Sequence, residues 1–191
     1  MESSKAEQSG KSKSSGGSLR LRIVVAAVLA IGLVLWIALR DDDSDDSSNA
    51  SNGAEIVSVD SLREAAGEQG SPIYWAGELQ GTELELSQPD SSRTYVRYLT
   101  GDTEAGDPNP DFLTVGTYED PKALQNLRKK GSGPGGVLAK APGGATVYFD
   151  SNRPTSVYVV YPGVDAQIEV YDPDFKRALQ LVNSGQIVSA G

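Results

Sequence analysis

The chain has 191 residues, with 17 Lys and Arg against 26 Asp and Glu, and it contains neither cysteine nor histidine. This length predicts one domain plus a short appendage. The missing cysteine excludes disulfides, thiolate nucleophiles and Cys-ligated zinc, and the missing histidine excludes Ser-His-Asp triads and His-ligated metals. From Asp41 onward the chain has 24 acidic and 11 basic residues, which argues against nucleic acid as a partner.

The first 22 residues are mostly Ser, Gly, Lys and Glu, a composition too poor in apolar groups to form a core. We therefore expect residues 1–22 to be a disordered basic tail. Residues 23–39 follow as IVVAAVLAIGLVLWIAL, without a charge. As a helix this run spans about 25 Å, close to a hydrocarbon core of about 30 Å. It predicts a transmembrane helix whose partner is the lipid bilayer, since a buried soluble helix would leave Arg22 and Arg40 beside a core.

The charges that flank this helix predict its orientation. Basic residues gather before it and DDDSDD follows it, so the N-terminus should be cytoplasmic and the C-terminal domain outside the cell membrane. A cleaved signal peptide is the alternative, but no small-x-small cleavage site follows the apolar run directly. Residues 40–54 are acidic and small, which is typical of a flexible linker. This linker lacks the glycine turn and terminal Glu of a calcium loop.

Residues 55–191 form the expected extracytoplasmic domain. Ser61 and Glu64 have the spacing of a capping box, which predicts a helix that opens near Asp60. Alternating or β-branched runs bounded by turn residues predict strands, and short turns join two pairs of them into hairpins. The predicted strands are residues 71–75, 82–88, 93–99, 112–118, 145–150, 156–161 and 166–171.

The last predicted strand shows the clearest alternation. Its residues Ala166, Ile168 and Val170 would face one side, and Gln167, Glu169 and Tyr171 the other. Such alternation with short connections predicts an α+β fold, with a mainly antiparallel sheet and about three helices, preceded by the one transmembrane helix.

A strand, an Asp-Pro pair and a helix also occur twice in this domain, after a hairpin each time. This indicates a possible duplicated strand-strand-strand-helix unit, in which Asp caps each helix and Pro takes its first position. The two helices should then pack in equivalent positions on one face, and residues 131–144, whose glycine-rich start (131–136) predicts a flexible loop, separate the copies. The first copy has Asp120-Pro121 followed by residues 123–127, and the second has Asp172-Pro173 followed by residues 178–182. As buried contacts, Leu124 and Leu127 of the first helix would match Leu179 and Val182 of the second.

The motifs that could carry chemistry are weak. Residues 131–136 satisfy G-x-G-x-x-G, but they follow a predicted helix and not a strand, so they read as a loop. Asp107, Asn109 and Asp111 have calcium-loop spacing, but Phe112 and Tyr118 stand where Gly and Glu are needed, which favours a solvated turn. No catalytic, cofactor-binding or metal-ligating residue and no cofactor is predicted. Eight tyrosines fall on predicted strands, where some could line a ligand face: Tyr74, Tyr95, Tyr98, Tyr118, Tyr148, Tyr158, Tyr161 and Tyr171.

Five stretches carry a resemblance over about residues 60–190: PIYWAG (72–77), YVRYLTG (95–101), FLTVGTY (112–118), PTSVYVVYPG (154–163) and IEVYDP (168–173). Together they resemble uncharacterised single-pass, membrane-anchored envelope proteins of high-GC Gram-positive bacteria. The resemblance implies a cell-envelope location. That group has no known activity, so no functional residue is carried over.

The favoured function is a binding or interaction module for an envelope protein, polymer or small ligand, and an enzyme is less favoured. Two alternatives stay open. Paired carboxylates could make the domain an envelope hydrolase, although the sequence does not tell which carboxylates meet. The domain could also be a sensor whose tail relays binding inward.

The topology can be tested by reporter fusion. A reporter active only outside the cytoplasm should give signal after Gly191 and none at the N-terminus, because positive charge stays inside. Changing Lys11, Lys13, Arg20 and Arg22 together to Glu should mix the two orientations. Signal at the N-terminus of the unmodified chain would contradict the predicted orientation.

Overall fold

A computed structural model describes residues 53–68, 70 and 72–191 of the chain. The expected tail (1–22), the expected membrane helix (23–39) and most of the expected linker (40–54) lie outside these residues. Within the part that is described, none of the helices combines the length and the apolar character needed to cross a bilayer.

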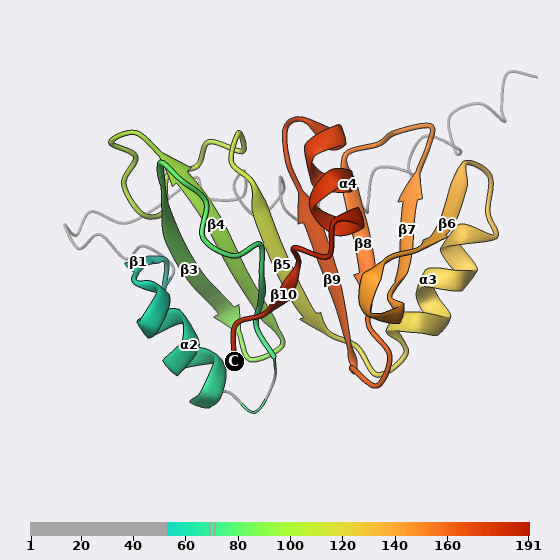
Figure 1. The fold of residues 1–191 in the computed structure, drawn as a ribbon, viewed down its shortest axis with the longest axis horizontal. Helices are drawn as coiled ribbons and strands as arrows, with labels where there is room; N and C mark the ends of the chain where they lie inside the picture. The colour runs from blue at the N-terminus through green and yellow to red at the C-terminus, as the bar shows by residue number, and fades with distance from the viewer. Residues whose placement is uncertain (1–52, 69, 71) are drawn as a thin grey trace, which may run out of the picture. The chain divides into compact units, whose positions relative to one another are not determined.

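An eight-stranded sheet forms the centre of the domain, and every neighbouring pair of strands in it is antiparallel (Figure 1). Three α-helices and a separate two-stranded sheet accompany it, which confirms the α+β prediction for the domain. In spatial order the strands are β1 (Glu55–Val57), β3 (Thr82–Asp90), β4 (Arg93–Thr100), β5 (Thr114–Glu119), β9 (Ala166–Tyr171), β8 (Ser156–Val160), β7 (Thr146–Asp150) and β6 (Gly136–Lys140). The other elements are α2 (Val59–Glu68), α3 (Ala123–Gly131), α4 (Phe175–Asn183), the short 3₁₀ helix η1 (Pro142–Gly144) and the pair β2 (Tyr74–Trp75) and β10 (Val188–Ser189).

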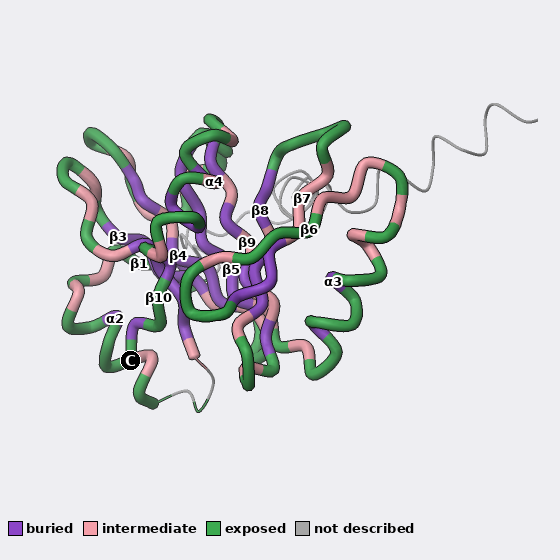
Figure 2. Tube along the Cα trace, turned by 45° about the vertical axis from the view of Figure 1, so that its right-hand side comes forward, coloured by how far each residue is buried: buried purple, intermediate pink, exposed green. Residues whose placement is uncertain are grey.

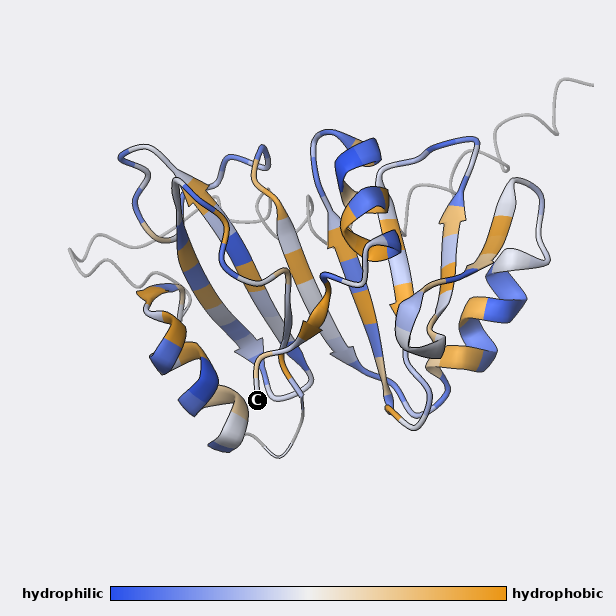
Figure 3. Ribbon diagram, viewed as in Figure 1, coloured by the Kyte–Doolittle hydropathy of each residue, from blue (hydrophilic) through white to orange (hydrophobic). Residues whose placement is uncertain are grey.

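One face of the sheet, which we call the core face, holds the main hydrophobic core. In β9 the residues Ala166, Ile168 and Val170 are buried and alternate with half-buried polar neighbours, as predicted. The strands accordingly show alternating hydrophobic and hydrophilic bands (Figure 3). Residues from α2, α4 and the β2–β10 pair pack on this face. Buried residues gather where these elements meet the sheet, whereas α3 and the loop tips are mainly exposed (Figure 2).

The strands follow the predicted duplication, but the helices do not. Strands β3-β4-β5 and β7-β8-β9 meet at β5 and β9 in mirror order. Helix α4 packs on the core face with Val157 and Val159, whereas α3 packs against Tyr148, Tyr158 and Val160. Successive residues of a strand point to opposite faces, so the two helices lie on opposite sides of the sheet.

The prediction of equivalent helices on one face is therefore wrong, and Leu124 is 37% exposed instead of buried. The connections explain the difference. Helix α3 leads from β5, in the middle of the sheet, to β6 at its outer edge, and it crosses on the face that α4 leaves open. Helix α4 leads from β9 to β10, which lies on the core face.

The helix starts also differ from the predicted caps. Ser61 donates its backbone N–H to the Ser58 side-chain oxygen at 3.1 Å, so α2 begins before the predicted capping box. Asp120 and Asp172 each accept the N–H two residues further on, at 2.8 Å in both cases. The Asp-Pro pairs therefore form turns that precede the helices, which start at Ala123 and Phe175.

Three short strands escaped the sequence analysis. Strand β6 follows the predicted loop of residues 131–136, in a stretch where no strand is predicted, and β1 and β10 have only three and two residues. All three are largely exposed, and an exposed strand does not show the polar and apolar alternation that half-burial imposes.

The packing of α3 can be tested by truncating two leucines of the same helix. Leu127 is fully buried and Leu124 is 37% exposed. Leu127→Ala should reduce the free energy of unfolding by about 2–5 kcal/mol, because it leaves a cavity against the sheet. Leu124→Ala should change it by about 0.5 kcal/mol or less. Chemical denaturation measures both, and equal effects would contradict the observed orientation of α3.

Candidate functional site

The sheet face opposite the core face carries a row of aromatic and polar residues. Strand pairing places Tyr95 opposite Gly116, Gly116 opposite Glu169, Glu169 opposite Tyr158, and Tyr158 opposite Tyr148. The row therefore crosses five neighbouring strands, from β4 to β7. Tyr118, two residues after Gly116, lies on the same face. We call Tyr95, Tyr118, Tyr148, Tyr158 and Glu169 the tyrosine face.

Gly116 gives this face its shape. A Cβ atom at this position would lie 3.0 Å from the Tyr118 ring and 3.2 Å from the Tyr95 ring, closer than side chains normally pack. The two rings meet edge to face above the glycine, with centroids 5.8 Å apart. A glycine in the middle of a strand often marks such a close approach. The missing side chain lets Tyr118 reach across β5 toward Glu169.

Glu169 lies at the centre of the tyrosine face and accepts a hydrogen bond from a phenol. The Tyr118 hydroxyl donates to its Oε2 atom at 2.8 Å, and Glu169 pairs with Tyr158 across strands β9 and β8. Burial, and after it the negative charge of Glu169, raise the pKa of Tyr118 and of Tyr158 well above the usual tyrosine value. Both phenols therefore stay protonated and can serve as donors. None of the ion pairs found within the described residues includes Glu169.

Helix α3 covers one end of the tyrosine face, where its Ala123 and Leu127 belong to a cluster against which Tyr148 and Tyr158 pack. The Lys130 ammonium lies 5.3 Å from the centroid of the Tyr158 ring, a cation–π distance. Tyr158 in turn stacks on Tyr148, with centroids 5.8 Å apart. A cationic group of the chain itself thus already rests on this aromatic surface.

The loop of residues 101–111 borders the same face on the other side. Glu85 is only 1% exposed, and it pairs with Arg97 at 2.9 Å and accepts the Gly106 N–H at 2.6 Å. Arg97 also donates to the backbone oxygens of Asp107 and Asn109, at 3.0 and 2.8 Å. This buried ion pair fixes the loop on the sheet, which the sequence did not predict.

The side chains with calcium-loop spacing form hydrogen bonds to the backbone within this loop. Asp107 accepts the backbone N–H of Asn109 at 2.7 Å, and Asn109 accepts that of Asp111 at 3.0 Å. The segment is thus a run of turns, as favoured from its sequence. Among the residues that the structure describes, no group of three or more acidic side chains is placed to hold a metal ion.

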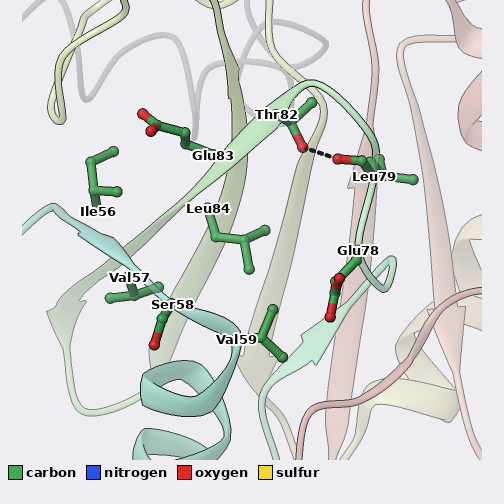
Figure 4. Close-up of a pocket in the computed structure, with 9 residues that line it drawn as sticks. All are labelled: Ile56, Val57, Ser58, Val59, Glu78, Leu79, Thr82, Glu83 and Leu84. Carbon is green, nitrogen blue, oxygen red and sulfur yellow. Dashed lines mark hydrogen bonds between the residues drawn. The ribbon is translucent and has the colours of Figure 1, made fainter.

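A separate hollow of about 410 Å³ lies near the start of α2 (Figure 4). Its wall is about equally polar and apolar, and Glu78 and Glu83 lie on opposite sides of it without facing each other. Of the other carboxylates near the sheet, Glu85 is bound to Arg97 and Glu169 to Tyr118. The hollow is lined by Ile56, Val57, Ser58, Val59, Glu78, Leu79, Thr82, Glu83 and Leu84.

The glycine motif of residues 131–136 runs from the last residue of α3 to the first residue of β6. It follows a helix and leads into a strand, which is the reverse of the order that a dinucleotide loop requires. The basic residues of the last turn of α3 include Lys130. The motif therefore connects two elements that border the tyrosine face.

Comparison with known proteins gives no match among family models, curated protein sequences or solved structures. The site is therefore described from its own geometry. The sequence placed the eight tyrosines on strands, and the structure divides them between the faces, with Tyr74, Tyr98 and Tyr161 on the core side. Gly116, the residue that brings Tyr118 to Glu169, was not singled out, although a lone glycine in a strand was a usable signal.

The Tyr118–Glu169 contact should make stability depend on alkaline pH. The pKa of Tyr118 lies above the value of 10.0 for a free tyrosine, so the folded state keeps its proton and the unfolded state releases it first. Its contribution is therefore complete below pH 10 and is lost as the pH rises further. Denaturation between pH 8 and pH 11 should show a smaller loss of stability for Tyr118→Phe than for the unmodified chain. Tyr171→Phe removes a tyrosine whose pKa is raised less, so its loss of stability with pH should differ less from that of the unmodified chain. Equal losses of stability in all three proteins would contradict the stabilising role of the Tyr118–Glu169 contact.

Proposed function

We propose that the chain is a membrane-anchored extracytoplasmic binding module, and that its tyrosine face binds an alkylammonium group carried by an envelope polymer or peptide. The observation that carries the proposal is Glu169. It is a carboxylate in the middle of the sheet, which accepts a hydrogen bond from the Tyr118 phenol and lies outside the ion pairs of the described residues. Anchor, orientation and envelope location rest on residues 23–39, on their flanking charges and on the resemblance stated above.

The chemistry of the face favours a cation over an anion. Aromatic rings attract cations through their electron-rich faces, and a nearby carboxylate adds a charge of the required sign. Lys130 already uses one of these rings in this way. The domain as a whole also repels anions, because residues 53–191 hold 19 acidic and 11 basic side chains.

The same geometry gives catalysis less support. Phenols whose pKa is raised are poor bases at neutral pH, so Tyr118 and Tyr158 position a ligand better than they accept a proton. Hydrolysis by paired carboxylates needs two such groups on either side of one bond. The carboxylates located above are each engaged with other partners or do not face each other.

The proposal is tested by titrating the full chain, in lipid nanodiscs, with a short oligolysine peptide in a calorimeter. Glu169→Gln should weaken binding about tenfold, because it removes one charge contact of roughly 1.4 kcal/mol and leaves the rings in place. Glu64→Gln removes the same charge from an exposed position on α2 and should change affinity less than about twofold.

A second titration with the same peptide, acetylated on its lysines, separates charge from shape. Acetylation removes the ammonium group and keeps the length, so the acetylated peptide should not bind. Equal weakening by Glu169→Gln and Glu64→Gln would mean that only the net charge of the domain attracts the peptide. Equal binding of the acetylated peptide would mean that the face takes a neutral ligand.

A further inference from the structure

Among the residues that the structure describes, none pairs with the outer edge of strand β6. It is the last strand of the eight, it pairs there with β7 alone, and its residues Leu138, Ala139 and Lys140 are exposed. Leu138 is 43% exposed and is one of the few large apolar side chains at the surface of the described domain. Helix α3 packs against β6, β7 and β8, and the inner side of the Leu138 side chain lies against Gly131, the last residue of α3. Open strand edges are templates for pairing with another chain.

The hydrogen bonds around β6 tell which backbone groups face outward. Ser151 donates to the Gly135 oxygen at 2.8 Å, and Ala141 donates to the Ala145 oxygen at 3.1 Å, in the same register that pairs β6 with β7. In an antiparallel ladder, inward and outward bonding alternate along the strand. The odd-numbered residues of β6 therefore bond to β7, and the even-numbered residues point their N–H and C=O groups away from the sheet.

The outward groups belong to Gly136, Leu138 and Lys140. The Gly136 N–H is already used, since it donates to the Gly133 oxygen at 3.1 Å. The backbone groups of Leu138 and Lys140 and the Gly136 oxygen take part in no such loop contact within the described residues. This short row of donors and acceptors is what an added antiparallel strand would bind.

We propose that β6 pairs with β6 of a second copy of this chain, antiparallel and in the register that places Leu138 opposite Leu138 of the other copy. In this register each Leu138 bonds to its counterpart, and each Lys140 N–H donates to the Gly136 oxygen across the interface. The strand is complementary to itself, because its one charged residue faces a glycine and the two exposed leucines come together. The Lys140 ammonium is also held on its own sheet by a 3.0 Å hydrogen bond to Thr146.

The symmetry of this pairing joins the two sheets without turning either one over. A two-fold axis between antiparallel edge strands is perpendicular to the sheet, so like faces stay on like sides. The two tyrosine faces would then lie on the same side of the joined sheet, with the α3 helix of each copy between them. A ligand with repeated ammonium groups could contact both, and its second contact would form at a high effective concentration. The pairing itself does not depend on the ligand proposed above.

The absence of cysteine in the chain allows a direct test of the register. Opposed residues of such a pair have Cα atoms about 5.5 Å apart, within the range for a disulfide. The full chain carrying Leu138→Cys should therefore cross-link in membranes when copper phenanthroline oxidises the two thiols, taking two electrons while two protons are released. The product should be a dimer that reductant reverses. Ile56→Cys is the matched control, because Ile56 is 44% exposed on the opposite edge strand β1, and it should cross-link several-fold less.

A second variant tests the pairing without a covalent bond. Leu138→Lys places like charges opposite each other, so the detergent-solubilised full chain should shift from dimer to monomer in sedimentation velocity. Leu124→Lys adds the same charge at an exposed position of α3 and should leave the dimer unchanged. Cross-linking of Leu138→Cys no greater than that of Ile56→Cys would overturn the proposal, and so would a chain that sediments as a monomer at every concentration.

Discussion

The pairing of β5 with β9 is the contact on which the rest of the domain depends. It joins the two four-stranded halves of the sheet through a register that runs from Thr114↔Tyr171 to Glu119↔Ala166. This register puts Val115 beside Val170 in the main core, and on the other face it puts Gly116 beside Glu169. A slip by one residue would exchange the two faces along a whole strand. The hydrophobic core and the tyrosine face are thus two consequences of one alignment.

The sequence predicts the strands that have one buried face, but it does not predict the strands that are exposed on both faces. Strand β9 alternates residue by residue, and its bounds came out as predicted. Strand β6 lies at an edge and is partly or fully exposed along its length. Its sequence therefore shows no alternation of apolar and polar residues. Its start at Gly136 also reads as a loop. Helix α3 was predicted from its Asp-Pro pair and from its match with the second helix. These signals show only that a helix forms, and the face on which it packs depends on where the next strand lies.

The candidate site was even less predictable from the sequence than the strands. Its tyrosines were visible as strand residues, but a row across five strands exists only after the register of four pairings is known. The residues that shape and border it are Gly116, Glu85 and Arg97, separated in sequence and without a shared motif. The Glu85–Arg97 pair is one that sequence patterns do not reveal, because its strength comes from burial and from the loop oxygens that satisfy the remaining donors.

Glu169 also bears on whether the tyrosine face serves the fold or a ligand. A part-buried carboxylate costs free energy, and the phenol of Tyr118 offsets part of this cost. A glutamine would accept the same hydrogen bond without the charge, and an apolar residue would pack better against the rings. The chain holds its loop with a carboxylate paired to arginine at Glu85, yet it places Glu169 among rings without such a pair in the described domain. The difference between these two carboxylates is what a charged ligand would explain and a purely structural role would not.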